Sequence, residues 1–403
     1  MKHIAIISPG ILPVPAVRGG AVESLITFLI EENEKTKGIA FDVFTVDDPG
    51  INGKNYRNTT IYPVKESKLV HLGDRVLDKI YRSLPGEISA RRIFDQTILK
   101  KLKRVVSKAE YKYDAIIVQN QTSLAVRLLK AGIAGNCPVF FHIHNDIDIY
   151  RSPHDCRWLA DRNVRFLCVS QYIKNRILTF APKADARVVY NGTDTDLFNR
   201  KHIEKRDLIR QEFGIHSDET VFLYSGRIIR QKGVRELMEG YHAFQNEHPD
   251  RSNRLLIVGM SDAPSKYEEQ IVEMRSTLGE KVLLAKKVGA LKMAEIVAAM
   301  DVVVIPTLDE EPFGMVAIEA MAMGKPIVAT SSGALTELLS TDNAIMISKG
   351  DHMTKDLAGA FEKLKDADLR KRMGENSQRR FEENEEWHKS AFYKNFCSAL
   401  GIT

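Results

Sequence analysis

Two carboxylates, eight positions apart, frame the stretch of this chain best suited to chemistry. Glu311 closes an acidic loop, and Glu319 lies on the helix expected to follow it. The loop comes after an apolar run typical of a buried strand, so the amides of Phe313, Gly314 and Met315 should form a bare helix N-terminus. Such a terminus attracts anions, whereas carboxylates accept hydrogen bonds from hydroxyl groups. The combination predicts a ligand that carries both an anionic group and sugar hydroxyls.

Two cations elsewhere in the chain have the character needed to stabilise a diphosphate. Arg227 and Lys232 lie on a glycine-flanked loop after another apolar run, with Gly226 directly before the arginine. Arginine presents a planar fork to phosphate oxygens and lysine a point charge. Fixed cations can meet the charge that a diphosphate gains when its bond to a sugar breaks. A solvated basic turn is the alternative, because Arg230 and Arg235 lie nearby.

The first half of the chain offers a glycine pair and a histidine. Gly19 and Gly20 follow the first expected strand and precede a helix, where glycine lets backbone amides approach a diphosphate or an acceptor. A simple turn is the alternative. His144 ends another strand, with His142 on the same face. We prefer His144 because ligands bind at the carboxyl ends of parallel strands; a satisfied structural histidine is the alternative. Further candidates for this region are Asn145, Asp146, Arg151 and Ser170.

Short patterns that would indicate other chemistry are weak or missing in the sequence. Asp194-Thr-Asp196 and Asp146-Ile-Asp148 match Asp-x-Asp, a metal motif that arises often by chance. The first strand is not followed by Gly-x-Gly-x-x-Gly, which argues against a nicotinamide enzyme, and no Walker-type loop is found. None of the four cysteines forms a Cys-x-x-Cys pair, so free thiols are expected. We expect neither a metal nor another cofactor.

Short apolar runs alternate with helical patterns along the whole chain. This rhythm predicts an α/β protein with parallel sheets covered by helices on both faces. The length of 403 residues favours two domains. Their expected strands are 4–7, 41–46, 115–118, 139–143, 166–169 and 188–190 in the first domain, and 221–224, 255–258, 282–284, 302–305, 327–329 and 344–347 in the second.

The two expected domains meet at a polar stretch. The boundary should fall after Phe198, so residues 1–198 form the first domain and residues 199–384 the second. An amphipathic helix within 385–403 carries aromatic residues at helical spacing. Two tandem units of this kind place a ligand crevice between them, at the carboxyl ends of the strands.

Four segments, in order along the chain, resemble one known family. Glu311-Pro-Phe-Gly with Glu319 is similar to the Glu-x7-Glu signature of retaining nucleotide-sugar glycosyltransferases of the GT-B fold, in the large family numbered four. The other three similar segments are Arg18-Gly-Gly20, Asn191-Gly-Thr-Asp194 and the Gly-Arg…Lys-Gly segment at 226–233. Residues 12–20 and 142–146 also resemble a bacterial subgroup linked to spore-coat and surface-polysaccharide assembly.

The resemblance implies a role for each candidate residue. Glu311 would accept hydrogen bonds from the donor sugar, Glu319 would hold the ribose, and the backbone of Val288 would read the base. His144 would lie near the donor sugar and the acceptor. The first domain would bind the acceptor and the second a UDP- or GDP-sugar. The segment at 385–403 would cross back onto the first domain.

Composition and hydropathy restrict the partners and the compartment. The net charge of +5 does not by itself indicate nucleic-acid binding, and no nucleic-acid partner is expected. Pro9 and Gly10 end the first apolar run, and no run of about 18 apolar residues follows, so neither a signal peptide nor a membrane span is expected. A basic stretch suits either a solvated helix face, slightly favoured, or contact with anionic headgroups, and it contains Lys100, Lys101, Lys103 and Arg104.

We therefore expect a metal-independent, retaining glycosyltransferase that acts on a glycan, lipid-linked or cell-surface acceptor. The expected compartment is the cytoplasm, and peripheral contact with the inner face of the membrane is an option. Two alternatives remain open. One is related GT-B chemistry, such as a nucleotide-sugar epimerase or a sugar phosphorylase, although the context of a phosphorylase's Schiff-base lysine is not visible. The other is a non-catalytic coat or scaffold protein on the same fold.

Overall fold

The computed structural model describes residues 1–36, 38–83, 92–146, 153–248 and 252–402. The chain divides into two compact units. The first comprises Met1–Gly192 together with Lys389–Thr403, and the second comprises Thr193–His388. Both are three-layered α/β units, as the alternation of apolar strands and helices predicts.

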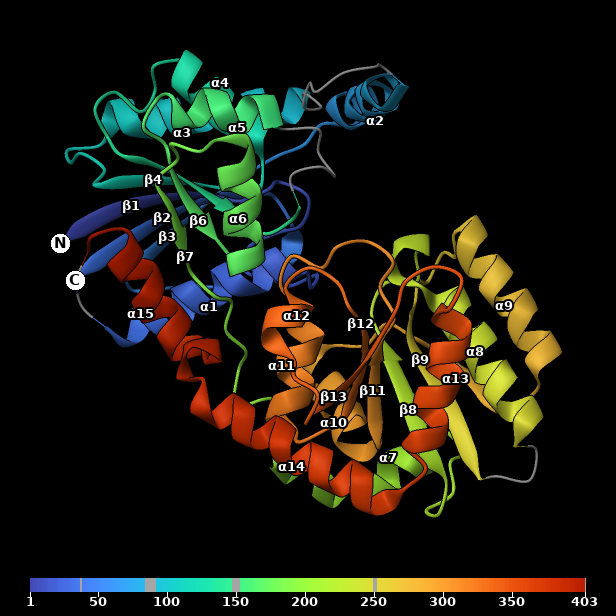
Figure 1. The fold of residues 1–403 in the computed structure, drawn as a ribbon. Helices are drawn as coiled ribbons and strands as arrows, with labels where there is room; N and C mark the ends of the chain where they lie inside the picture. The colour runs from blue at the N-terminus through green and yellow to red at the C-terminus, as the bar shows by residue number, and fades with distance from the viewer. Residues whose placement is uncertain (37, 84–91, 147–152, 249–251, 403) are drawn as a thin grey trace. The chain divides into compact units, whose positions relative to one another are not determined.

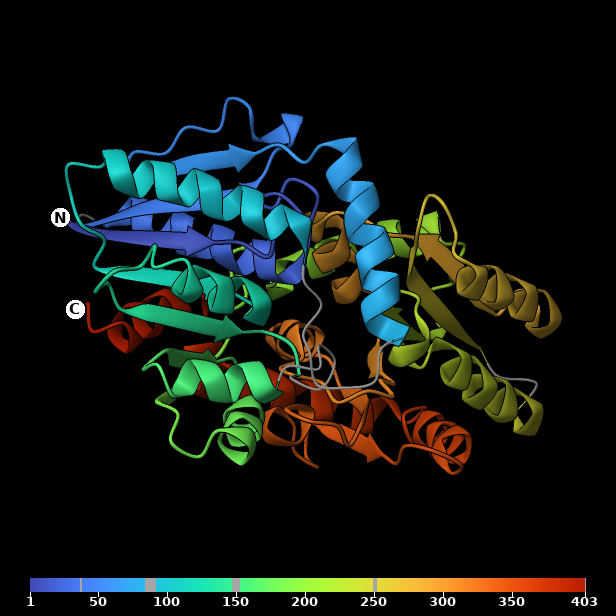
Figure 2. The same cartoon turned by 90° about the horizontal axis from the view of Figure 1, so that it is seen from above.

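The first unit is built on a parallel sheet of seven strands in the order β3-β2-β1-β4-β5-β6-β7. Helices α3 and α4 cover one face of the sheet, and α1 and α15 cover the other (Figures 1 and 2). The strands are β1 (Lys2–Ile7), β2 (Ile39–Val46), β3 (Thr59–Val64), β4 (Ala115–Gln119), β5 (Val139–Ile143), β6 (Arg165–Cys168) and β7 (Ala186–Val188). The helices are α1 (Ala21–Lys35), α2 (Lys68–Ser83), α3 (Ile93–Lys108), α4 (Thr122–Lys130), α5 (Pro153–Ala160), α6 (Gln171–Phe180) and α15 (Lys389–Ala399).

The second unit contains a parallel sheet of six strands in the order β10-β9-β8-β11-β12-β13. Its core includes a cluster of aromatic rings formed by Phe222, Tyr241, Phe244 and Phe361. The strands are β8 (Thr220–Ser225), β9 (Asn253–Met260), β10 (Val282–Lys286), β11 (Val302–Ile305), β12 (Ile327–Thr330) and β13 (Ala344–Ile347). The helices are α7 (Arg206–Glu212), α8 (Val234–Glu247), α9 (Lys266–Leu278), α10 (Ala290–Ala299), α11 (Met315–Ala322), α12 (Leu335–Leu338), α13 (Met353–Lys363) and α14 (Ala367–Glu383).

Both sheets reverse their strand order beside the strand that begins the unit. β1 lies between β2 and β4, and β8 lies between β9 and β11. The loops that leave β1 and β8 therefore start at topological switch points, where open parallel sheets bind their ligands. These loops carry Gly19 and Gly20 in the first unit, and Arg227 and Lys232 in the second. The predicted class of two Rossmann-like parallel-sheet domains is confirmed.

Three details differ from the expectations. Strand β3 was not predicted, and it contains Pro63. It lies at the edge of its sheet, where proline is tolerated. Strand β7 ends at Val188, whereas the sequence suggested 188–190.

The third difference is the position of the boundary. The units divide at Gly192 rather than after Phe198. Thr193 already belongs to the second unit, because its amide donates a hydrogen bond of 2.8 Å to the carbonyl of Trp387. The turn Glu385–Trp387 stays with that unit, while α15 belongs to the first.

Helix α15 is anchored within the first unit by an aromatic face and by hydrogen bonds. Phe392 and Phe396 are fully buried and lie against the ring of His142. The hydroxyl of Tyr393 donates to Asn33 Oδ1 at 2.9 Å.

Within the described ranges, no helix combines the length and the apolar character that a membrane span requires.

Candidate functional site

Two loops of the second unit are joined by backbone contacts at the carboxyl edge of its sheet. We call residues 226–233, after β8, the cation loop, and residues 309–314, after β11, the acidic loop. The carbonyl of Gln231 accepts a hydrogen bond of 2.8 Å from the amide of Leu308. Gly233 has φ +67°, and a Cβ atom there would lie 1.9 Å from the carbonyl oxygen of Pro306. Only glycine allows the cation loop to approach this closely.

This approach brings together the predicted residues Lys232 and Glu311. Lys232 Nζ lies 2.6 Å from Glu311 Oε2, with both side chains partly buried. The backbone of Glu311 is held on both sides. Its amide donates to Ser332 Oγ at 3.2 Å, and its carbonyl accepts from the amide of Ala334 at 2.8 Å. The backbone that carries this carboxylate is therefore fixed by the turn before α12.

The acidic loop ends at the N-terminus of α11, as expected. Gly314 precedes the helix with φ +104°, and a Cβ atom there would lie 2.7 Å from a methyl carbon of Leu335. Helix α11 begins at Met315, and its N-cap residue is Gly314, which has no side chain that could cap the helix. Phe313 is buried. The terminus thus keeps the electropositive end of the helix dipole without a side-chain cap.

Glu319 lies on the second turn of α11, among buried neighbours such as Ile318 and Ala320. Its side chain retains some accessible surface, but dense protein surrounds the carboxyl group. Burial raises the pKa of Glu319 to about 8. In the part of the chain that the structure describes, the carboxyl group has neither a hydrogen-bond nor an ion-pair partner. Buried acids normally have a partner, so this group is suited to a ligand that supplies one.

Arg227 and Gly226 lie exposed at the start of the cation loop. The hydroxyl of Tyr224 donates to the carbonyl of Arg227 at 2.7 Å and so fixes its backbone. The guanidinium group has no partner among the described residues. Val288 is also exposed, on the loop between β10 and α10. These three residues lie on loops that leave the carboxyl edge of one sheet.

His144 and His142 belong to the first unit. His144 follows β5 and is buried, with Nε2 2.8 Å from Gln119 Oε1. Its Nδ1 has no partner among the described residues. Burial lowers the pKa of His144 to about 3, so the imidazole is neutral at physiological pH. The ring of His142 is tilted by 47° against that of His144, with 4.1 Å between their centroids, and it packs against α15, further from the edge of the sheet.

Gly19 and Gly20 precede α1 in the first unit, and a residue that we had not predicted accompanies them. Glu23 is buried, and a Cβ atom on Gly20 would lie 2.2 Å from its Oε2. Burial raises the pKa of Glu23, and the amides of Glu23 and Leu12 oppose this rise. The carboxyl group thus lies over the N-terminus of α1. The sequence contained a signal for this arrangement, because Glu23 is the third residue of the helix, a position from which glutamates often fold back onto the start of a helix.

The remaining candidates have local structural roles or fall outside the description. Tyr172 donates to Asp146 at 2.6 Å. Ser170 Oγ caps α6 by accepting from the amide of Ile173. Asp194 accepts from the amide of Asp196 at 3.0 Å, as in a turn. Asp148 and Arg151 lie outside the described residues, and within the described ones no cluster of His, Cys, Asp and Glu suits a metal ion.

The two halves of the sequence match two known families. Residues 22–197 match the family described as Glycosyltransferase Family 4, and residues 219–366 match Glycosyl transferases group 1. The lipopolysaccharide 1,2-N-acetylglucosaminetransferase of Salmonella typhimurium is 27% identical in an alignment of 309 positions that covers 72% of this chain and 76% of that protein. Spore coat protein SA of Bacillus subtilis is 24% identical over 96% of this chain and 97% of its own.

Solved structures show the same fold along the full length. Sucrose-phosphate synthase from Thermosynechococcus elongatus superposes with a TM-score of 0.76 at 20% identity, covering 99% of this chain and 98% of its own. HepE from Anabaena, solved in complex with UDP and glucose, has a TM-score of 0.74 at 17% identity and covers all of both chains. At these identities the likeness concerns the fold.

Proposed function

We propose that this chain, whose two halves match Glycosyltransferase Family 4 and Glycosyl transferases group 1, moves a sugar from a UDP- or GDP-sugar to an acceptor hydroxyl with retention of configuration and without a metal ion. The observation that carries the proposal is the Lys232–Glu311 pair beside the uncapped terminus of α11. The pair joins a cation for the diphosphate and a carboxylate for the sugar, and α11 also carries Glu319, whose carboxyl group has no partner among the described residues.

Binding of the donor would exchange partners at this pair. Lys232 is held by Glu311 at 2.6 Å. A diphosphate offers Lys232 and Arg227 more negative charge, and the amides at the start of α11 add to the attraction. Glu311 then accepts hydrogen bonds from the sugar hydroxyls, and Glu319 accepts them from the ribose. The base would lie along the backbone at Val288.

The reaction requires one bond to the anomeric carbon to break and another to form. The bond from the anomeric carbon to the diphosphate breaks, and the acceptor oxygen bonds to the same carbon on the same face. The proton of the acceptor hydroxyl passes to an oxygen of the leaving phosphate. Arg227 and Lys232 stabilise the charge that develops there, a role often given to a metal ion elsewhere. At physiological pH the neutral His144 can exchange hydrogen bonds but carries no charge.

The donor and the acceptor are proposed as classes. A neighbour of the same fold is solved with UDP and glucose, which supports a UDP-sugar as the first donor to test. A relative named for N-acetylglucosamine transfer to lipopolysaccharide supports a glycan or lipid-linked acceptor. The first unit would bind it, with the amides at Gly19 and Gly20 close to the ligand.

Contact with an anionic membrane is a separate part of the proposal. Lys100, Lys103 and Arg104 are exposed on α3, whereas Lys101 lies over the ring of Tyr62. Reversal of these three exposed charges should abolish co-sedimentation with vesicles that contain phosphatidylglycerol. Wild-type protein that never binds such vesicles would refute the contact.

A turnover assay tests the enzymatic proposal. The protein is incubated with UDP-glucose, UDP-N-acetylglucosamine or GDP-mannose and a lipid-linked glycan fraction, and free nucleoside diphosphate and labelled glycan are measured. We expect both products with one donor, an α-linked product from an α-linked donor, and no effect of EDTA. Donor epimerised without acceptor would instead support the epimerase, and a protein that binds no nucleotide-sugar would support the scaffold.

A further inference from the structure

A pocket of about 290 Å³ lies at the opposite edge of the same sheet in the second unit. It opens where β11 and β12 begin, at Asp301 and Pro326, whereas the donor site lies beyond the carboxyl ends of these strands. Helix α14 forms one wall. A Cβ atom on Gly374 would lie 2.4 Å from the carbonyl oxygen of Gly324, so glycine lets this helix pack closely against the end of α11.

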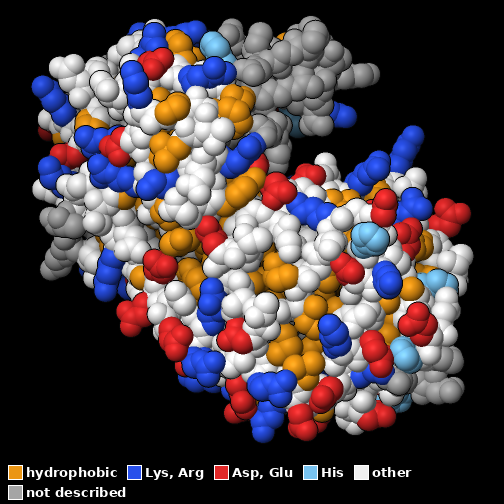
Figure 3. All heavy atoms as spheres, in the orientation of Figure 1, with side chains coloured by type: hydrophobic (Ala, Val, Ile, Leu, Met, Phe, Trp, Pro, Cys, Tyr) orange, Lys and Arg blue, Asp and Glu red, His pale blue; other side chains and the backbone are white. Residues whose placement is uncertain are grey.

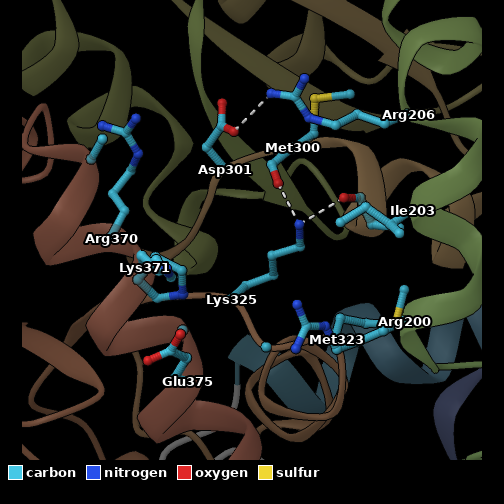
Figure 4. Close-up of a pocket in the computed structure, with 15 residues that line it drawn as sticks. Arg200, Ile203, Arg206, Met300, Asp301, Met323, Lys325, Arg370, Lys371 and Glu375 are labelled. Carbon is cyan, nitrogen blue, oxygen red and sulfur yellow. Dashed lines mark hydrogen bonds and ion pairs between the residues drawn. The ribbon is translucent and has the colours of Figure 1, made fainter.

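Lys325 lies in the middle of the pocket (Figure 4). Its Nζ donates to the carbonyls of Ala298 at 2.6 Å and Met300 at 2.7 Å, at the end of α10. An ammonium group has three protons, and no acceptor among the described residues takes the third. Burial lowers the pKa of Lys325 to about 8, which leaves the group mostly charged at neutral pH. The hydrogen-bond acceptors of this cation are neutral carbonyls, and the charge of Asp301 favours its charged form only from beyond ion-pair distance.

Three more cations line the pocket without a carboxylate partner within 4 Å in the described chain. Arg200 donates to the neutral side chain of Gln378 at 2.7 Å. Arg370 donates to two main-chain carbonyls at the end of α13. Lys371 is exposed and makes no hydrogen bond or ion pair. Figure 4 shows Arg200 and Arg370 on opposite sides of Lys325.

The carboxylates of the pocket do not neutralise these four cations. Asp301 is shared by Arg210 at 2.6 Å, Arg206 at 3.3 Å and the amide of Val221 at 2.7 Å. Glu375 also lines the pocket and pairs with none of the described cations. The arrangement differs from the surface of α14 seen in Figure 3, where basic and acidic side chains are interspersed.

We propose that this pocket is a second ligand site, which binds a phosphate group carried by a small soluble molecule or by a lipid. Four cations without carboxylate partners offer the charge, and lysine and arginine together suit the oxygens of a phosphate. The volume is enough for a phosphate with a body of sugar size. The proposal is independent of the donor site, because the two lie at opposite edges of the sheet.

Thermal unfolding with added anion is the first test. Inorganic phosphate and glucose 6-phosphate are titrated at constant ionic strength, with glucose and sodium chloride as controls. A ligand of the folded state raises the melting temperature in a saturable manner. We expect saturation with at least one of the two phosphates and none with glucose. The shift should persist in Lys232→Ala, because that variant alters only the donor site.

Variants of residues that line the pocket test whether the phosphate binds there. Lys371→Glu combined with Arg200→Ala should weaken binding about tenfold or more, equivalent to at least about 1.4 kcal/mol. Arg372→Glu is the matched control, since Arg372 is exposed on the same helix but does not line the pocket. It should bind as the wild type does. Melting of each variant without anion separates lost binding from lost folding.

The source of the phosphate group is decided by a vesicle arm. A lipid headgroup is assigned if the protein sediments with phosphatidylglycerol vesicles and free phosphate releases it from them. The double variant Lys371→Glu with Arg200→Ala should then no longer sediment with the vesicles. Saturable binding of soluble phosphates alone would assign a soluble ligand. The site is refuted if neither occurs, if Arg372→Glu loses as much as the pocket variant, or if Lys232→Ala abolishes the effect.

Discussion

The proposed donor site combines one ion pair, Lys232 with Glu311, with two charged or titratable groups, Arg227 and Glu319, that have no side-chain partner among the described residues. Lys232 and Glu311 neutralise one another at 2.6 Å while both side chains keep contact with solvent, about 30% of the lysine and 15% of the glutamate. Pairs of this kind contribute only about 1 kcal/mol. An incoming diphosphate can therefore displace Glu311 from Lys232 at little cost, and the released carboxylate becomes available to the sugar.

Removal of either partner should abolish transfer and leave the fold intact. We expect Lys232→Ala and Glu311→Ala each to lower the turnover rate about 100- to 1000-fold, the loss typical of one stabilising group at a transition state. Lys349→Ala is the matched control, because Lys349 and Glu310 form another ion pair of 2.6 Å. Steady-state rates of the three variants measure the loss of transfer, and circular dichroism shows whether each variant keeps its fold. Wild-type rates in either site variant would refute the roles given to these residues.

Glu319 should make nucleotide binding depend on pH. Its pKa of about 8 in the free protein means that most molecules carry a protonated carboxyl at pH 7. Ribose hydroxyls donate to the ionised form, so UDP should bind more tightly as pH rises from 7.5 to 9 and should release a proton on binding. Calorimetry in buffers of different ionisation enthalpy measures that proton. In Glu319→Gln the dependence should disappear.

The same shift affects stability in the opposite direction. A carboxyl group whose pKa is raised by folding gives its full contribution below the unfolded value of 4.5 and loses it as pH rises through about 8. The loss is on the order of a few kcal/mol, at about 1.4 kcal/mol per pKa unit. Glu319→Gln should therefore unfold at a higher denaturant concentration than the wild type at pH 8, and at a similar one at pH 4.5. Equal midpoints at pH 8 would contradict the burial of this carboxyl.

At the scale of elements, the donor site depends on how closely two loops approach. Gly233→Ala places a Cβ atom 1.9 Å from the carbonyl oxygen of Pro306 and must push the cation loop away. We expect the variant to lose donor binding more than tenfold. Gly214→Ala is the control, because Gly214 has a similar φ of +64° but nothing within 4 Å of a Cβ atom. Both substitutions destabilise the protein by about 1–2 kcal/mol, because alanine is placed in a left-handed conformation. A difference in UDP affinity between the two variants therefore reports the clash at Gly233 alone.

The elements around the site follow from local sequence more readily than their contacts do. The apolar strands, the glycine turns and the start of α11 are readable because each depends on a few neighbouring residues. The Lys232–Glu311 pair joins positions 79 apart in sequence, and it forms only because Gly233 meets Pro306. Pro63 hid strand β3, since a proline within a short apolar run gives no sign that the strand will lie at an edge.

At the scale of the whole molecule, the chain leaves the first unit at Gly192 and returns at Lys389. Helix α15 therefore completes the first unit from the far end of the sequence. Phe396→Ala should destabilise that unit by about 3–5 kcal/mol, because the ring is fully buried. Tyr393→Phe should cost only about 1 kcal/mol for its hydrogen bond to Asn33. Denaturant unfolding that ranks the two variants in the reverse order would contradict this packing.

The central claim, a donor site that holds a nucleotide-sugar with fixed cations, is tested most directly by melting the protein with UDP-, GDP- and ADP-sugars, with and without EDTA. A ligand of the folded state raises the melting temperature according to its concentration relative to its dissociation constant. We predict a shift with one UDP- or GDP-sugar that EDTA does not change and that Lys232→Ala abolishes. No shift with any of them, or a shift that EDTA removes, would contradict the account.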